Sequence, residues 1–234
     1  MSTDPNSPSN PAHGQRRIRS FVRREGKLTS GQDKALNEVW PLVGVPLDAQ
    51  LIEFDQLFKR TAPVVLEIGF GNGLSLAHMA EQHPELNFFG IEVHRPGVGS
   101  LLVQVKKLGL ENVRVSQDDA VEVFKQQVPP DSLSRLQIFF PDPWHKKRHH
   151  KRRLINAEFI NLAVSRLKAG GTLHVATDWE NYAEQILEVL SACPLLANTA
   201  ENYAPKPDYR PSTKYEERGI RFGHSVFDLV FKKL

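Results

Sequence analysis

The stretch VVLEIGFGNG, residues 64–73, joins an apolar run to a loop with a glycine at every second position. The run at 64–68 has the length and the β-branched residues of a buried strand. Gly69, Gly71 and Gly73 permit a tight turn from this strand into a helix and let the backbone approach a ligand closely. The stretch therefore predicts a strand, a turn and a helix in direct succession, with a ligand site at the turn.

The same alternation of strands and helices continues along the chain. Strands are expected at 64–68, 87–93, 113–117, 136–140 and 172–177, and helices at 74–82, 99–108, 120–127, 156–167 and 180–191. This order indicates βαβ units, which build a mostly parallel sheet with helices on both faces. The last apolar run, SVFDLVF at 225–231, follows a long loop rather than a helix, so it can insert antiparallel.

The composition fits one soluble α/β domain with a flexible end. The chain has 234 residues, of which 40% are hydrophobic, enough for a sizeable core. Its single cysteine, Cys193, rules out an internal disulfide and fits a reducing compartment. No apolar run approaches the roughly 18 residues that a transmembrane helix needs. We therefore expect a cytoplasmic protein without membrane attachment.

The N-terminal segment is expected to lie outside the domain. Residues 1–15 are almost wholly polar, and they cannot bury enough apolar surface to offset the entropy of ordering, so we expect a disordered tail. Residues 16–50 form a basic N-terminal extension, with six cations between 16 and 27. Charge pattern alone favours a solvated tail and an RNA contact equally. The domain itself is expected at 51–234.

Acidic residues stand at or beside the end of each expected parallel strand. Because ligands bind at the carboxyl ends of the strands in such sheets, five acidic positions at one edge indicate a polar site. The acids are Glu67, Glu92, Asp118 with Asp119, Asp142 and Asp178.

The glycine spacing distinguishes between two classes of nucleotide ligand. A dinucleotide fingerprint needs its third glycine at position 74, which is Leu74, so a nicotinamide cofactor is disfavoured. The observed E-x-G-x-G-x-G spacing instead resembles motif I of class I S-adenosylmethionine-dependent methyltransferases. This resemblance implies S-adenosyl-L-methionine as the cofactor and Glu67, Gly69 and Gly71 as part of its site.

Two further acids complete the expected cofactor site. Glu92 is placed to accept hydrogen bonds from both ribose hydroxyls, because a carboxylate offers two acceptor oxygens. Asp119 is placed near the adenine amino group and at the start of the next helix, with Asp118 as the alternative.

The second decisive stretch is PDPWHKKRHHKRR at 141–153. Two prolines restrict the backbone around Asp142, and the nine residues that follow Trp144 are all histidine, lysine or arginine. Extended by the two preceding residues to FFPDPWHKKRHHKRR (139–153), the stretch resembles the hallmark of the bacterial tRNA (guanine-N7)-methyltransferase family. The stretches that agree with it are LEIGFGNG (66–73), FGIEVHRPGVG (89–99), ATDWENYAE (176–184) and RPSTKYEERGIRFGHSVFDLVF (210–231).

The resemblance implies a fold and a reaction. The fold is Rossmann-like, a mostly parallel seven-stranded sheet with an antiparallel C-terminal strand. The reaction is methyl transfer to N7 of the variable-loop guanine, position 46, of tRNA. Guanine N7 carries a free lone pair and needs no proton removed, so catalysis should consist of positioning and electrostatics. Asp142 is implied as the catalytic carboxylate, which also contacts the cofactor.

The remaining implied roles concern the RNA. Substrate binding is expected at Lys146, Asp178, Thr213, Lys214, Tyr215 and Glu216. Contacts to the phosphate backbone are expected at Arg148, His149, His150, Lys151, Arg152 and Arg153. Neutralising the last three together should flatten the salt dependence of tRNA binding.

Several alternatives stay open. His145 and His149 have the spacing of metal ligands, but flanking cations and the lack of a cysteine or carboxylate ligand set favour no metal. Trp144 either stacks on the base or packs beneath the loop, and the second is favoured. A methyltransferase acting on another RNA or on protein, and a non-catalytic RNA-binding protein, are the competing functions. The sequence does not distinguish a monomer from a homodimer.

Overall fold

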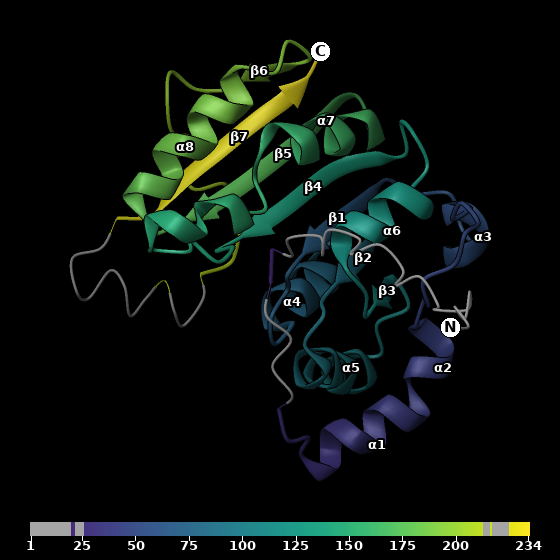
Figure 1. Ribbon diagram of the computed structural model, residues 1–234. Helices are drawn as coiled ribbons and strands as arrows, with labels where there is room; N and C mark the ends of the chain where they lie inside the picture. Colours follow the sequence, from purple (N-terminus) through teal and green to yellow (C-terminus); the bar gives the residue numbers. More distant parts are fainter. Residues whose placement is uncertain (1–19, 22–25, 213–215, 217–224) are drawn as a thin grey trace, which may run out of the picture.

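The structure, a computed structural model, describes residues 20–21, 26–212, 216 and 225–234 (Figure 1). The expected polar tail at 1–15 and most of the basic run at 16–27 lie outside the described residues.

Seven strands form one sheet in the order β3-β2-β1-β4-β5-β7-β6. Strands β1 to β5 pair in parallel, and β7 pairs antiparallel with both β5 and β6. The strands are β1 (Val64–Ile68), β2 (Asn87–Ile91), β3 (Val113–Ser116), β4 (Leu133–Phe139), β5 (Leu167–Thr177), β6 (Leu196–Asn198) and β7 (Phe227–Lys233). The strand order reverses between β1 and β4, so the switch point at which α/β sheets bind ligands lies between these two strands.

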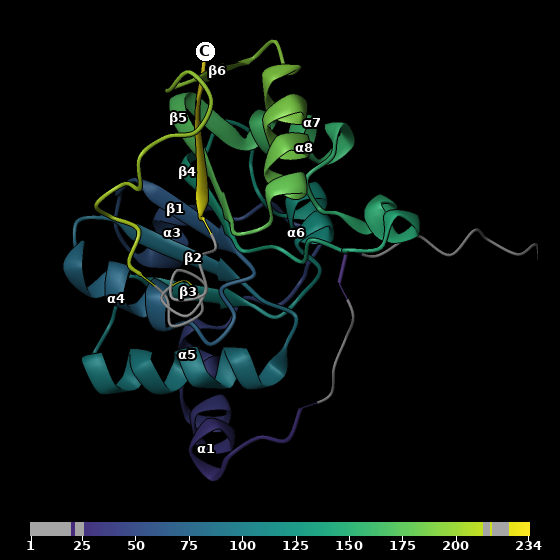
Figure 2. The ribbon, with the colours of Figure 1, turned by 90° about the vertical axis from the view of Figure 1, so that its left-hand side faces the viewer.

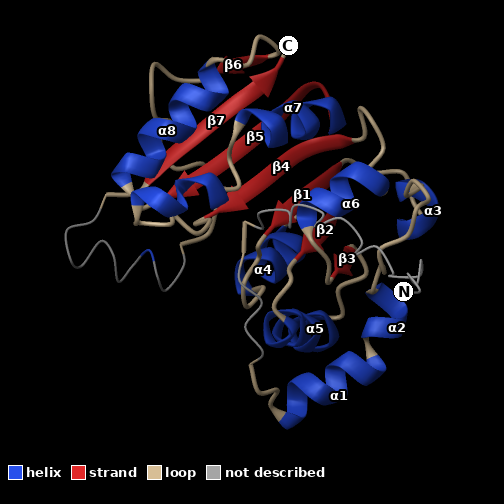
Figure 3. Cartoon of the chain, in the orientation of Figure 1, coloured by secondary structure: helices blue, strands red, loops and turns tan. Residues whose placement is uncertain are grey.

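Helices cover both faces of the sheet (Figure 3). One core contains side chains of α3 (Phe54–Phe58), α6 (Ala120–Gln126), α7 (Ala157–Arg166) and α8 (Glu180–Ser191). The other contains those of α1 (Ser30–Glu38), α2 (Trp40–Val43), α4 (Leu74–Gln82) and α5 (Arg95–Leu108). No helix in the described part of the chain is long and apolar enough to cross a membrane.

The structure confirms the expected alternation of strands and helices from β1 to α8 and the antiparallel C-terminal strand β7, whereas the short strand β6 was not expected. The bounds of β1, α4 and α8 coincide with the prediction, whereas β4 and β5 begin several residues earlier. Two helices precede residue 51, at which the domain was expected to begin. Helix α1 packs against α5 and buries Ala35 and Leu36, α2 buries Val43 in the same core, and Gly44 bridges to Val115 at the edge of the sheet.

A sequence signal for α1 was present. Thr29 and Gln32 form a capping box, in which the amide of Gln32 donates to Thr29 Oγ1 (3.2 Å) and the amide of Thr29 donates to Gln32 Oε1 (2.8 Å). The T-x-x-Q pattern starts a helix whose buried side chains are few and small, so the hydrophobic periodicity is weak.

Candidate active site

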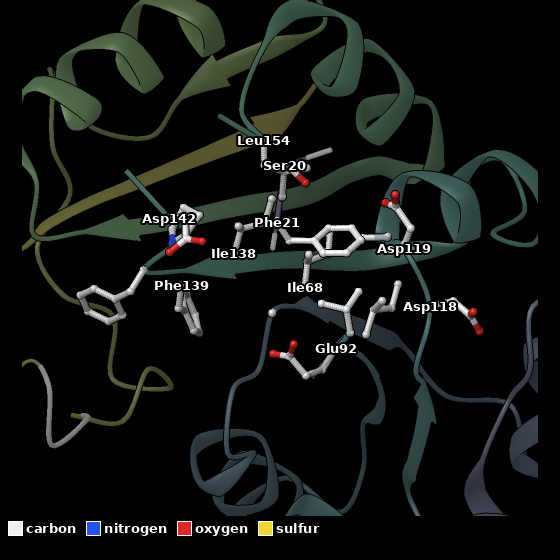
Figure 4. A pocket seen from close by; sticks show the side chains of 16 residues that line it. Ser20, Phe21, Ile68, Glu92, Asp118, Asp119, Ile138, Phe139, Asp142 and Leu154 are labelled. Atoms are coloured by element: carbon white, nitrogen blue, oxygen red, sulfur yellow. The ribbon is translucent and has the colours of Figure 1, made fainter. Parts of the chain in front are cut away.

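A pocket of about 230 Å³ lies at the carboxyl ends of β1, β2 and β4, where the strand order reverses (Figure 4). It brings together four of the predicted site residues, from four different connections. These are Gly69, Glu92, Asp119 and Asp142, and Asp118 lines the same pocket.

The glycine loop after β1 forms one wall of the site. Gly71 adopts a φ of 58°, in the left-handed region that favours glycine. Gly97, in the first turn of α5, lies so close to this loop that a Cβ there would clash with the carbonyl oxygen of Gly71. The close contact between Gly71 of the loop and Gly97 of α5 therefore holds the loop in place.

Glu92 links the loop to β2. Its carboxylate accepts hydrogen bonds from the amides of Gly71 (2.9 Å, to Oε2) and His94 (2.9 Å, to Oε1). A carboxylate has about four acceptor positions, so two protein donors leave capacity for a ligand. The side chain lines the pocket, and a fixed pair of acceptor oxygens there fits a ribose diol.

The two acids after β3 differ in their partners. Asp119 caps α6, with its Oδ1 accepting from the amide of Val121 (3.0 Å). Asp118 Oδ2 instead accepts from the amide of Leu47 (3.1 Å), which ties β3 to the segment before α3. Both side chains line the pocket, and the tie to Leu47 gives Asp118 a structural role.

Glu67, in β1 directly before the pocket residues Ile68 and Gly69, is a buried carboxyl group that does not itself line the pocket. Its residue is 3% exposed, and Oε2 has no hydrogen-bond partner among the described residues. Burial, with a smaller contribution from the negative charge of Glu92, raises the pKa of Glu67 to about 8. A buried acceptor without a partner fits a ligand that brings a donor or a positive charge, and the sulfonium cofactor of a class I methyltransferase carries both.

We expect Glu67→Gln to stabilise the cofactor-free protein in a pH-dependent way. Because folding raises the pKa of Glu67, its contribution to stability is full below the unfolded pKa and is lost as pH rises toward about 8. The free energy of unfolding of the variant should therefore rise relative to that of the wild type between about pH 5 and about pH 8. The difference should reach roughly 2–4 kcal/mol at the upper end.

Urea unfolding of both proteins across this range measures the difference. Glu81→Gln, an exposed carboxylate on α4, is the matched control and should show no such trend. A constant difference between Glu67→Gln and wild type at every pH would contradict the raised pKa.

Asp142 lies in a turn with unusual backbone geometry. Phe140 and Trp144, on either side of the Pro-Asp-Pro sequence, have φ values of 50° and 49°. Bulky residues rarely adopt positive φ, and such positions cluster at functional sites. The amide of Phe140 donates to the carbonyl of Ala176 (2.7 Å), which fixes the turn to the end of β5.

Trp144 packs beneath the basic segment that follows it, the arrangement favoured from the sequence. The guanidinium of Arg152 lies 4.0 Å from the centre of its ring system, and the His149 ring meets it edge-on. Its Nε1 donates to the carbonyl of Ser20 (3.2 Å). The segment itself forms the 3₁₀ helix η1 (Lys147–Arg152). Three of its cations, Lys147, Arg148 and Lys151, are exposed, and so is Lys146 directly before it.

The structure corrects the expected phosphate contact of Arg153. This residue is 2% exposed, and its guanidinium donates to the carbonyl of Pro143 (2.8 Å) and to Asn181 Oδ1 (3.0 Å). It also stacks over the ring of Tyr182. Arg153 therefore connects the Asp142 turn to α8 instead of facing an RNA.

The predicted substrate residues differ in their exposure, and three of them have no described position. Asp178 and Lys146 are exposed, at the end of β5 and before η1. Thr213, Lys214 and Tyr215 lie outside the described residues. Glu216 is 3% exposed, and its carboxylate accepts two hydrogen bonds from Arg210 (2.8 and 2.9 Å).

Two pocket residues were missed from the sequence. Ser20 and Phe21 belong to the basic N-terminal extension, yet both line the pocket, and the Phe21 ring lies between Asp119 and Ile138 (Figure 4). The only signal was a single aromatic residue within a basic run, which pattern analysis does not interpret. Among the residues with described positions, no cluster of histidine, cysteine or carboxylate side chains could hold a metal.

Comparisons with known proteins agree with this site. A family described as "Putative methyltransferase" matches residues 61–229. A tRNA (guanine-N(7)-)-methyltransferase of Paraburkholderia xenovorans (strain LB400) is 56% identical over 227 residues, 97% of this chain and 87% of the relative. Another of the same name, from Shewanella amazonensis (strain ATCC BAA-1098 / SB2B), is 55% identical over 94% of this chain and 93% of the relative.

Solved structures with little sequence identity share the fold. The 16S rRNA methyltransferase KamB superposes with a TM-score of 0.59 at 16% identity, covering 77% of this chain and 92% of that one. A 16S rRNA (adenine(1408)-N(1))-methyltransferase variant from Catenulisporales acidiphilia gives 0.54 at 15% identity, covering 80% of this chain and 94% of that one. The fold is thus that of class I methyltransferases, and the relatives at more than half identity extend the likeness to nearly the whole chain. The protein belongs to the tRNA (guanine-N(7)-)-methyltransferase family.

Proposed function

We propose that the protein transfers the methyl group of S-adenosyl-L-methionine to N7 of a guanine in tRNA, at position 46 of the variable loop. The observation that carries this proposal is the meeting of Glu92, Asp119 and Asp142 in one pocket, directly before an exposed cationic segment. The relatives that share more than half of their residues with the chain carry the same activity in their names.

S-adenosyl-L-methionine supplies an electrophilic methyl group on a positively charged sulfur. Glu92 would hold the ribose hydroxyls, Asp119 the adenine amino group, and the loop of Gly69 and Gly71 the methionine part. Glu67 would then gain the partner that its Oε2 atom lacks. Placing a cation beside this carboxyl favours its ionised form, so we expect Glu67 to release its proton when the cofactor binds.

Asp142 acts on the acceptor. Guanine N7 already offers a lone pair, so the protein has to orient the base and stabilise the positive charge that the base acquires. The Asp142 carboxylate would accept from N1–H or the N2 amino group, which fixes the base and places a negative charge beside it. The strained turn between Phe140 and Trp144 gives this carboxylate a defined position.

The exposed cations hold the RNA. Lys147, Arg148 and Lys151 would bind phosphates, which gives affinity and register but not the choice of base. Lys146, two residues after Trp144, and Asp178, directly after the end of β5, are exposed and would contact the guanosine itself. The tRNA substrate and the single buried cysteine, Cys193, support a cytoplasmic location.

Mapping the methylated product tests the proposal. Incubation with unmodified tRNA and the methyl donor should give N7-methylguanosine, detected by strand cleavage at one variable-loop position after borohydride and aniline treatment. A methyl group on the ribose or on an exocyclic amine gives no such cleavage and would identify a different methyltransferase. Donor binding without any methylated product would indicate a non-catalytic RNA-binding protein.

A further inference from the structure

Phe21 is an aromatic residue of the N-terminal extension whose side chain lies at the pocket. The basic run at 16–27 contains no other aromatic residue. Phe21 and its neighbour Ser20 are partly buried and line the pocket, and the Phe21 ring lies between Asp119 and Ile138 (Figure 4). Phe21 therefore belongs to the pocket wall, although three helices separate it from β1 in the chain.

The surroundings of the Phe21 ring match the chemistry of a nucleobase. A base has flat apolar faces, which stack on aromatic rings, and a polar edge that forms hydrogen bonds. Asp119, beside the ring, is the acid that would hold the adenine amino group. Aliphatic side chains supply the other apolar surface of the pocket: Ile68, Ile91, Val93, Ala120 and Ile138. An aromatic ring, aliphatic side chains and a carboxylate together fit an adenine.

Two side chains of the basic segment hold the main chain at Phe21. Trp144 Nε1 donates to the carbonyl of Ser20 (3.2 Å), and Arg152 Nη2 donates to the carbonyl of Phe21 (3.4 Å). These carbonyl groups stand directly before and after the Phe21 Cα, so the contacts define where its side chain points. Figure 2 shows the piece 20–21, in purple, apart from α1 and near η1.

We propose that Phe21 is a cofactor-binding residue that contacts the adenine ring of S-adenosyl-L-methionine, and that Trp144 positions it there. The inference rests on the proposed function only for its cofactor, and the acceptor of the methyl group does not enter it. Trp144 acts through Ser20 and Phe21 and does not line the pocket.

Phe21→Ala tests the contact. Calorimetric affinity for S-adenosylhomocysteine, the demethylated cofactor, should fall about fivefold to 100-fold, the usual effect of removing an aromatic ring that stacks on a base. Phe21→Leu, which keeps an apolar side chain but has no ring, should lose less. Methylthioadenosine has the base and the ribose but no amino acid part, so its affinity should fall by the same factor as that of S-adenosylhomocysteine.

Phe227→Ala is the matched control. Phe227 on β7 is also partly buried, and its ring packs against Tyr203 (4.9 Å between ring centres), outside the pocket. Titrations are run where unfolding curves show every variant fully folded, and the control should keep wild-type affinity for both ligands.

Trp144→Phe tests the positioning role, because it keeps an aromatic ring and loses the Nε1 donor. Affinity for S-adenosylhomocysteine should fall about twofold to tenfold, the net value of one hydrogen bond. The double variant Phe21→Ala with Trp144→Phe should bind within about twofold of Phe21→Ala alone, because the second change acts only through the missing ring.

Unchanged affinity in folded Phe21→Ala would overturn the contact. A higher affinity would overturn it as well, because the ring would then occupy the place of the base. A loss for S-adenosylhomocysteine but not for methylthioadenosine would move the ring to the amino acid part. Independent losses in the double variant would overturn the role of Trp144.

Failure of the proposed function is recognised separately from failure of this inference. Wild-type protein that binds S-adenosylhomocysteine but forms no N7-methylguanosine would refute the proposed reaction, and the Phe21 titrations would still decide the contact. Wild-type protein that binds neither ligand would overturn both.

Discussion

Asp142→Asn should lower kcat for tRNA methylation by about 10²- to 10³-fold, the usual loss when one electrostatic contact to the transition state is removed. The amide is nearly the same size as the carboxylate, so the strained turn should persist. It lacks the negative charge that stabilises the guanine ring as it becomes positive. It also offers one acceptor oxygen where the carboxylate offers two.

The cofactor affinity separates this role from a structural one. Asp142 stands at one end of the pocket and Glu92 and Asp119 hold the expected nucleoside end, so calorimetric binding of S-adenosylhomocysteine should change only slightly. Glu81→Gln, which removes an exposed carboxylate on α4 outside the pocket, is the control and should keep wild-type turnover and affinity. An equal loss of affinity and turnover in Asp142→Asn would refute the catalytic assignment.

The sequence predicted the part of this architecture that depends on local pattern. Strand β1 and helix α4 follow from an apolar run and a glycine loop, and their bounds coincide with the prediction. Helix α1 was missed because it buries only Ala35 and Leu36. Its tertiary contact with α5 has no counterpart in local periodicity. Because that contact could not be predicted, the domain was expected to begin only at residue 51.

The site, too, could be predicted only where it depends on local pattern. Acids at strand ends could be placed at one edge of the sheet because parallel strands end together, and Glu92, Asp119 and Asp142 do share a pocket. Burial could not be predicted within the basic run. Arg153 looks like its neighbours in sequence, yet its partners on α8, Asn181 and Gln185, lie 28 and 32 residues further along the chain.

This difference within the basic run changes what should happen when its charges are removed. Replacing Lys147, Arg148 and Lys151 together with glutamine should reduce the slope of log affinity for tRNA against log salt by about 2 to 3, because each phosphate contact contributes about 0.7–0.9. All three side chains are exposed, so the fold should tolerate the change. Binding measured from low to moderate salt gives the slope, and affinity should fall most at low salt.

A second triple variant separates local contact from net charge. Lys107, Lys168 and Lys232 are exposed on α5, β5 and β7, and replacing them with glutamine removes the same charge elsewhere. Long-range attraction depends on total charge and is screened within about 10 Å at 0.1 M salt, whereas counterion release requires direct phosphate contact. If both triple variants lower the slope equally, η1 is not the RNA contact.

Arg153→Gln should differ from both triple variants, because its buried guanidinium supports the turn. We expect a lower unfolding temperature with an unchanged slope of log affinity against log salt.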